Sequence, residues 1–347
     1  MKRGLSLAGM LLAALALAAA ALAKNTASVA VSHGSMTTSA TTSTTIHVTI
    51  PQATDPIARI AIYAPAGYAA NVGAAAGTTI GDVNATGFAR DTGLTLPLTG
   101  NVVTDSPANY TSNACAPGAH AAVWILNLSV AGQAIQLPVY VDPTSGAETA
   151  LGSVRLVTCL GPPDVPQGTP GRSPFGTQLL DAKFTVNNVL TTPGQSALLH
   201  WETLFAPYNP GQGTVNVLGT FEAQALVGIP GTVSLKAVSV KHKTFKVSGT
   251  VTEGGTPAAG VSVQFYRGAS ATKLVRVTSA KTGAGGTFSF TGAFGKAKQL
   301  FFQAKASAGE RDTPCVAALP ASIAPGGCAT ATLSPWTADS TVAKAKR

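Results

Sequence analysis

Residues 122–130 read AVWILNLSV, a short apolar run that ends two residues before a glycine. Several other stretches have the same character: residues 46–50 (IHVTI), 137–141 (LPVYV), 154–158 (VRLVT) and 215–221 (VNVLGTF). Apolar and polar residues that alternate between Gly, Pro, Asn or Asp are typical of half-buried strands joined by turns. Because no long amphipathic helical pattern follows residue 23, the sequence predicts an all-β fold.

One proline-rich stretch interrupts this pattern at residues 161–174 (GPPDVPQGTPGRSP). Five prolines in fourteen residues cannot form a helix or a central strand, so a stiff connector is expected there. Since residues 177–240 would be a small unit to fold alone, we expect one large β-sandwich-type domain over 24–240 that contains the connector. Two sandwiches that meet near residue 170 are the alternative. A smaller β-sandwich is predicted over 241–336, followed by a basic tail at 337–347.

The N-terminus has the layout of a secretory signal peptide, predicted for residues 1–23. Lys2 and Arg3 precede an apolar stretch that ends in Ala21-Leu22-Ala23, where we expect cleavage. An uncleaved membrane anchor is the alternative, because about 20 apolar residues can span a bilayer. After cleavage no transmembrane segment is expected, and the protein would be secreted or associated with the cell wall.

Four cysteines follow this segment, and an even number in an exported chain favours disulfides. Three pairings are possible, of which we expect Cys115 with Cys159 and Cys315 with Cys328, because each pair lies inside one predicted domain. A zinc site is the rival interpretation, but no Cys-x-x-Cys occurs and the five histidines are scattered. No metal or cofactor is therefore predicted.

Charge is scarce and unevenly distributed. Only 11% of residues are charged, and the formal net charge is +9. From residue 241 onward there are 14 Lys and Arg against 4 Asp and Glu, a net of +10, whereas residues 24–240 have 7 against 10, a net of −3. The basic character thus belongs to the C-terminal region.

Residues 244–306 show an ordered series of strands and glycine turns. GTV at 249–251 is followed by the pattern G-x-P-x-x-G-V-x-V at 255–263 (GTPAAGVSV). A second pattern, T-G-x-x-G-x-F-S-F, lies at 282–290 (TGAGGTFSF). This order resembles the carboxypeptidase regulatory-like, or prealbumin-like, Ig-like β-sandwich modules of bacterial secreted proteins. The resemblance implies a spacer, stabiliser or binding accessory without catalytic residues. The remainder loosely resembles secreted actinobacterial proteins of unassigned function, which implies no activity.

No catalytic signature is present in the sequence. The nearest approach to a nucleophile motif, residues 171–176 (GRSPFG), has the wrong spacing and lies in the connector. The one aromatic and acidic cluster, Trp201, Glu202 and Tyr208, is a candidate ligand contact because such side chains suit sugar stacking. On an alternating strand, the Trp201 side chain would face the core and the Glu202 side chain would lie on the other face of the strand.

Dispersed lysines are the second candidate site. Contact with an anionic surface is hypothesised for six of them: Lys241, Lys243, Lys246, Lys296, Lys298 and Lys305. The alternative is that these lysines only solubilise the chain and protect strand edges. Nucleic acid is not an expected partner, because an exported protein rarely meets it and no aromatic stacking platform is visible.

These observations predict a non-enzymatic structural or adhesive protein of the bacterial envelope. Its partners would be anionic envelope polymers or other surface proteins. The alternative is a secreted carbohydrate-binding protein or hydrolase with its site in residues 24–240 and an accessory C-terminal sandwich.

Overall fold

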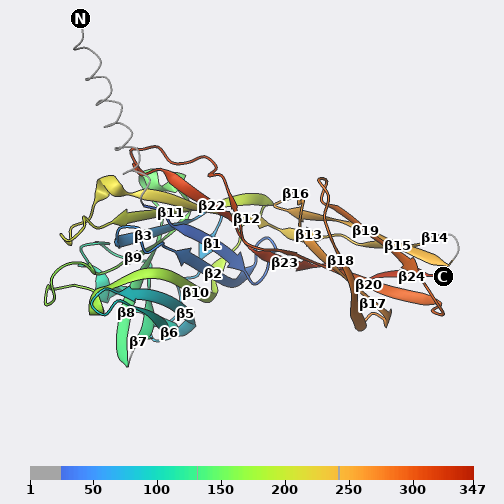
Figure 1. Cartoon of the computed structure of the whole chain (residues 1–347), viewed down its shortest axis with the longest axis horizontal. Helices are drawn as coiled ribbons and strands as arrows, with labels where there is room; N and C mark the ends of the chain where they lie inside the picture. Colours follow the sequence, from blue (N-terminus) through green and yellow to red (C-terminus); the bar gives the residue numbers. More distant parts are fainter. Residues whose placement is uncertain (1–24, 131, 241–242) are drawn as a thin grey trace, which may run out of the picture.

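The computed structural model describes residues 25–130, 132–240 and 243–347, so the predicted signal peptide lies outside the described residues. The described chain is all-β, as predicted, and has a large curled sheet followed by a smaller sandwich (Figure 1). Its helical segments are the short turns η1 (Pro107–Tyr110), η2 (Gly146–Ala150), η3 (Pro174–Gly176) and η4 (Val217–Gly219). No helix in these ranges is long and apolar enough to cross a membrane.

Fourteen strands of the described residues form the large sheet. Their order is β1 (Ser28–His33), β2 (Thr41–Thr49), β10 (Thr177–Thr191), β5 (Thr79–Ala89), β6 (Leu94–Asp105), β7 (Ala122–Val130), β8 (Gln133–Pro143), β9 (Val154–Cys159), β3 (Ile57–Ala64), β11 (Ala197–Pro207), β12 (Phe221–Ile229), β22 (Cys328–Leu333) and β21 (Arg311–Thr313), with β4 (Ala69–Ala70) beside β10. β12 and β22 run parallel, whereas the other strand pairs within the described ranges are antiparallel.

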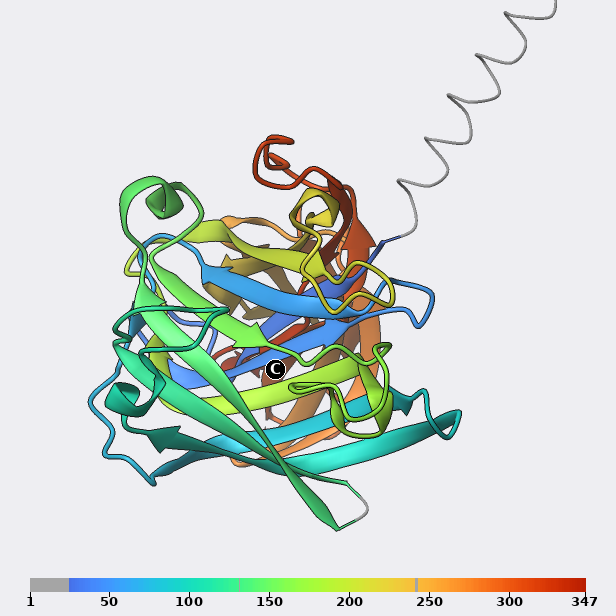
Figure 2. The same cartoon turned by 90° about the vertical axis from the view of Figure 1, so that its left-hand side faces the viewer.

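The large sheet curls until its two ends meet. The amide of Val31 in β1 donates to Ser334 Oγ, just after β22, at 3.0 Å. Figure 2 shows the strands surrounding a common interior, which Ile46, Trp124, Leu156 and Phe205 help to fill. Because side chains alternate along each strand, one set lines this interior and the other set faces outward.

Part of the outer face is also apolar. Tyr63, Val123, Tyr140 and Val157 form a second buried cluster on β3, β7, β8 and β9. The disulfide Cys115–Cys159 joins the loop after β6 to the end of β9, beside this cluster. Cys315–Cys328 joins the loop after β21 to the start of β22. Both predicted disulfides are therefore present.

The small sandwich has two sheets. One contains β13 (Gly231–Val233), β15 (Thr244–Glu253) and β14 (Lys236–Val240), with β16 (Thr256–Pro257) and β19 (Thr287–Ala293) paired to β15. The other contains β18 (Lys273–Lys281), β17 (Ser262–Ser270), β20 (Gln299–Ala308) and β23 (Trp336–Asp339), with β24 (Ala343–Lys346) paired to β20. Phenylalanine side chains fill the space between the two sheets. The ring centroids of Phe245 and Phe302, one from each sheet, lie 4.7 Å apart.

The strand pairing differs from the sequence-based boundaries at three points. The small sandwich begins at β13 instead of residue 241, because β13 and β14 both pair with β15. β21 and β22 return to the large sheet, so Cys315–Cys328 lies there and not in the small sandwich. Residues 337–347 are not a free tail, because β23 and β24 pair with β20.

A fourth difference concerns residues 215–221, which the alternation predicts as a strand. The turn η4 interrupts this stretch at its centre, where the Asn216 side chain accepts a hydrogen bond from the Gly219 amide at 3.0 Å. The connector at 161–174 joins β9 to β10 without a strand of its own, as expected. It folds against the end of the curled sheet, where Pro163 and Val165 are buried.

Candidate functional site

Trp201 lies in the interior of the large sheet. β11 points its side chain inward, and it has no exposed surface. Its ring centroid lies 5.0 Å from that of Tyr68 and 6.2 Å from that of His33. Burial lowers the pKa of His33 to about 4, so this imidazole is neutral at physiological pH. Trp201 is thus a core residue, and a sugar ring in solvent has no access to it.

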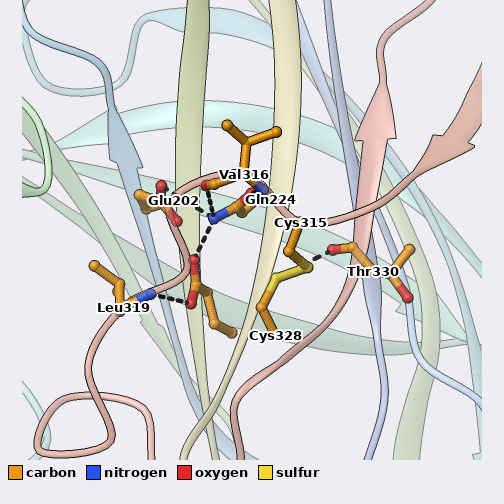
Figure 3. Close-up of a disulfide and its surroundings, with 8 residues drawn as sticks. Glu202, Gln224, Cys315, Val316, Leu319, Cys328 and Thr330 are labelled. Carbon is orange, nitrogen blue, oxygen red and sulfur yellow. Dashed lines mark hydrogen bonds between the residues drawn. A yellow bond between two sulfur atoms is a disulfide. The ribbon is translucent and has the colours of Figure 1, made fainter.

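Glu202, the next residue, points to the opposite face of β11, as the alternation predicts. There it faces Gln224 of β12 (Figure 3). Glu222 of the same strand also contacts it. The Gln224 amide nitrogen Nε2 lies 2.6 Å from Glu222 Oε1 and 3.5 Å from Glu202 Oε1. Glu222 and Gln224 are fully buried and Glu202 is 7% exposed. We call these three residues the carboxylate cluster.

The loop closed by Cys315–Cys328 covers the carboxylate cluster. Gln224 Nε2 donates to the Val316 carbonyl at 2.8 Å, and the Val316 amide donates to Gln224 Oε1 at 2.7 Å. The Leu319 amide donates to Glu222 Oε2 at 2.9 Å. The cluster therefore serves as the hydrogen-bonding surface on which a disulfide-tethered loop is held.

Two carboxyl groups this close together cannot both ionise easily in a buried site. Burial first, and then the hydrogen bond and the negative charge of Glu222, raise the pKa of Glu202 to about 9. Glu202 is consequently protonated at neutral pH. A protonated carboxyl beside a second carboxyl group is chemically suited to proton transfer, but the loop covers this pair and keeps it from solvent.

Tyr208 directly follows the last residue of β11 and lies away from Trp201 and Glu202. Its hydroxyl donates to the Leu160 carbonyl at 2.5 Å, and its side chain is 7% exposed. The three residues of the predicted ligand contact thus occupy three separate environments: the interior, the carboxylate cluster and the end of the curled sheet.

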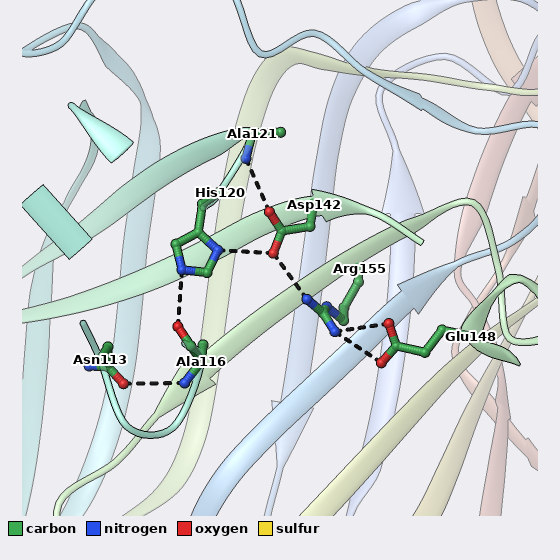
Figure 4. A network of polar contacts seen from close by, with 7 residues as sticks. All are labelled: Asn113, Ala116, His120, Ala121, Asp142, Glu148 and Arg155. Carbon is green, nitrogen blue, oxygen red and sulfur yellow. Dashed lines mark hydrogen bonds and ion pairs between the residues drawn. The ribbon is translucent and has the colours of Figure 1, made fainter. Parts of the chain in front are cut away.

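A second polar network holds the other disulfide-tethered loop (Figure 4). His120 Nδ1 lies 3.0 Å from Asp142 Oδ2, and His120 Nε2 lies 3.1 Å from the Ala116 carbonyl. Asp142 also pairs with Arg155 at 3.2 Å, and Arg155 pairs with Glu148 at 2.9 Å. Because these contacts link the loop before β7 to β8 and β9, the network is a structural support for that loop.

The structure brings together three of the six lysines that the sequence singled out. The Phe294 amide donates to the Lys243 carbonyl, and the Arg347 amide donates to the Lys298 carbonyl, both at 2.9 Å. The end of the small sandwich farthest from the large sheet, where Figure 1 marks the C-terminus, therefore gathers six exposed basic residues. We call them the basic end: Lys243, Lys296, Lys298, Lys344, Lys346 and Arg347.

The other three lysines are not among these six residues. Lys246 is exposed on β15, Lys305 pairs with Asp339 at 3.2 Å, and Lys241 lies outside the described residues. Sequence reasoning missed Lys344, Lys346 and Arg347 as members of this group because it treated them as a tail. Throughout the described ranges, no three His, Cys, Asp or Glu side chains group in a way that could hold a metal ion.

Comparison with known proteins gives little further information. No family model matches the chain, and no curated protein matches it. Among solved structures it is similar to the full-length major pilin SpaD from Corynebacterium diphtheriae, with 12% identity and a TM-score of 0.30. The match covers 93% of this chain and 68% of the pilin. Identity and score at this level give no basis for transferring the pilin's role.

Proposed function

We propose that the protein is a non-enzymatic structural or adhesive component of the bacterial envelope, secreted or held at the cell surface. The observation that carries this proposal is how the large sheet and the small sandwich are joined. The chain passes between them three times: from β12 to β13, from β20 to β21 and from β22 to β23.

Side-chain and backbone contacts reinforce these crossings. The Gly231 amide donates to the Met36 carbonyl at 3.0 Å, and the Gly254 amide donates to the Pro230 carbonyl at 3.0 Å. A Cβ at Gly231 would lie 3.0 Å from the Trp336 ring, so a larger residue there would require the ring to shift by a few tenths of an ångström. Three strand connections resist bending better than one flexible linker, which suits a part that transmits force.

The second support is the basic end. Its six cationic side chains lie at one extremity of the molecule. The four acidic side chains of residues 231–347 lie elsewhere: Glu253, Glu310 and Asp312 at the junction with the large sheet, and Asp339 beside Lys305. A cluster of one sign attracts a polyanion, and salt screens that attraction. We infer that anionic envelope polymers are the partner at this end.

We also propose that residues 244–306 are a carboxypeptidase regulatory-like module to which this chain has added strands. β13 and β14 precede the module and β23 and β24 follow it, and all four pair with its strands. On this division, the first domain comprises the large sheet with its returning strands β21 and β22.

Sedimentation of the purified mature protein with isolated bacterial cell envelopes tests the role of the basic end. The variant Lys243→Gln/Lys298→Gln/Lys346→Gln should lose most of its binding at low salt, and added NaCl should release the wild type. The control Lys183→Gln/Lys236→Gln/Lys281→Gln removes the same charge from exposed positions elsewhere and should bind normally. Equal binding by both variants, or binding that salt does not weaken, would contradict the proposed contact.

A further inference from the structure

An apolar cavity of about 370 Å³ lies at the end of the curled sheet remote from the small sandwich. β11 begins at Ala197 beside Ile229, next to the junction, and ends at Pro207 beside Ile57, which lines the cavity. The connector at 161–174 forms one wall, and strands β5, β6, β7, β8 and β10 form the others. This volume lies in the range of small-molecule sites, which often occur where strands enclose an apolar interior.

The cavity continues toward the interior of the sheet. A smaller space of about 50 Å³ lies next to it and shares five of its lining residues: Ala85, Leu128, Leu137, Leu160 and Leu179. The inner lining is apolar except for Thr158. An extended hydrocarbon group that entered from the connector side would therefore meet apolar surface along its path.

The connector is fixed on both sides of this opening. Arg172 forms a two-point ion pair with Asp91 in the turn after β5, with Nη1–Oδ2 and Nη2–Oδ1 distances of 3.0 and 2.5 Å. Asp164 Oδ2 accepts a hydrogen bond from the Gly211 amide at 2.8 Å. The opening is thus built by ordered contacts and is not a gap beneath a loose loop.

The polar groups around the cavity select the chemistry of its occupant. Arg172 is neutralised by Asp91, and Gln178 is satisfied by the Thr54 carbonyl at 2.9 Å and by Arg90 at 2.6 Å. The Ser173 hydroxyl lines the cavity, is buried, and has no hydrogen-bond partner among the described residues. A buried hydroxyl of this kind favours a ligand that supplies one hydrogen bond.

We propose that this cavity binds an uncharged, apolar small molecule with a single hydrogen-bonding group, of the long-chain alcohol or neutral lipid class. The hydrocarbon part occupies the space toward Leu128 and Leu137, and the polar group meets Ser173. An ionised carboxylate is disfavoured, because no unpaired cation of the described residues lines the site and burial of a lone charge is costly.

Diphenylhexatriene, an uncharged probe that fluoresces only in apolar surroundings, tests the site in the full mature protein. Saturable fluorescence at one probe per chain is expected, and dodecanol should displace the probe more effectively than dodecanoate at pH 8. Ile135→Trp fills the cavity and should weaken probe binding at least about tenfold, whereas Ile135→Ala should retain it. Ser173→Ala should weaken dodecanol about two- to tenfold, the effect of one hydrogen bond, and leave the probe unaffected.

Three results would overturn the proposal: no saturable fluorescence, unchanged probe binding by Ile135→Trp, or displacement by dodecanoate as effective as by dodecanol. Ala271→Trp, at an exposed turn of the small sandwich, is the control for added aromatic surface. Retained binding by Ile135→Ala would show that a change at this position does not by itself disrupt the fold. Loss of binding by Ile135→Trp alone would then identify the cavity as the binding site.

Discussion

Glu202 provides the sharpest prediction at the scale of single residues. Its pKa is raised from 4.5 to about 9 in the folded protein, so the folded state holds a proton that the unfolded state releases at lower pH. Its contribution to stability is therefore complete below pH 4.5 and is lost as the pH rises toward 9. Glu202→Gln keeps the shape and an uncharged amide, and should make the thermal midpoint less dependent on pH over this range.

Glu148→Gln is the control, because Glu148 pairs with Arg155 in the partly exposed network on another part of the sheet. Thermal unfolding of the wild type and both variants at several pH values makes the comparison. If Glu202→Gln retained the pH dependence of the wild type, the protonated carboxyl would not be its source.

Trp201 gives a second residue-scale prediction. Its side chain is fully buried against Tyr68, so Trp201→Ala should lower the free energy of unfolding by about 3–5 kcal/mol. Leu198→Ala, at a 44% exposed position of the same strand, should change it by less than about 1 kcal/mol. Urea unfolding measures both, and similar values for the two variants would contradict the core position of Trp201.

Alternation along β11 placed Trp201 and Glu202 on opposite faces from sequence alone. The partners of Glu202 could not be predicted in the same way. Glu222 and Gln224 face it only because β12 pairs with β11 in a particular register, and register depends on the whole sheet. The lone carboxylate expected from the sequence is therefore one of a buried pair.

At the scale of elements, the two disulfide-tethered loops should respond independently to loss of their bonds. Cys315→Ser/Cys328→Ser should lower stability by about 2–5 kcal/mol and increase hydrogen exchange at the Val316 and Leu319 amides. These amides donate to the carboxylate cluster, which the freed loop would uncover. Cys115→Ser/Cys159→Ser should leave their exchange unchanged and affect the loop before β7 instead. Exchange at Val316 and Leu319 that did not rise in the first variant would show that the disulfide does not hold the loop.

Local patterns predicted individual strands better than their long-range pairing. β7 matches its predicted stretch because its residues favour a strand wherever they pack. Residues 215–221 were predicted wrongly, since Asn216 and Gly219 form a local turn that competes with a strand. The parallel pairing of β12 with β22 joins residues about a hundred positions apart, and no local signal marks it.

At the scale of the whole molecule, the sequence predicted that the positive charge lies in the C-terminal region. It did not predict that six of the basic residues gather at one end of that region. The basic end forms because β24 pairs with β20 and brings Lys344 and Lys346 beside the turn that carries Lys296 and Lys298. The return of β21 and β22 to the large sheet could not be predicted from the sequence either. Because of this return, three connections join the large sheet to the small sandwich. A cavity at one extremity and a cationic surface at the other give the molecule two distinct ends.

The location of the mature protein in fractionated cells tests the proposed envelope role most directly. The account predicts that it is found with the cell envelope, that a wash with high NaCl releases it, and that Lys243→Gln/Lys298→Gln/Lys346→Gln shifts it to the medium. Wild-type protein found wholly in the cytoplasm would contradict the proposed export. Wild-type protein found wholly in the medium, or retained equally by the envelope with and without these lysines, would contradict the envelope contact of the basic end.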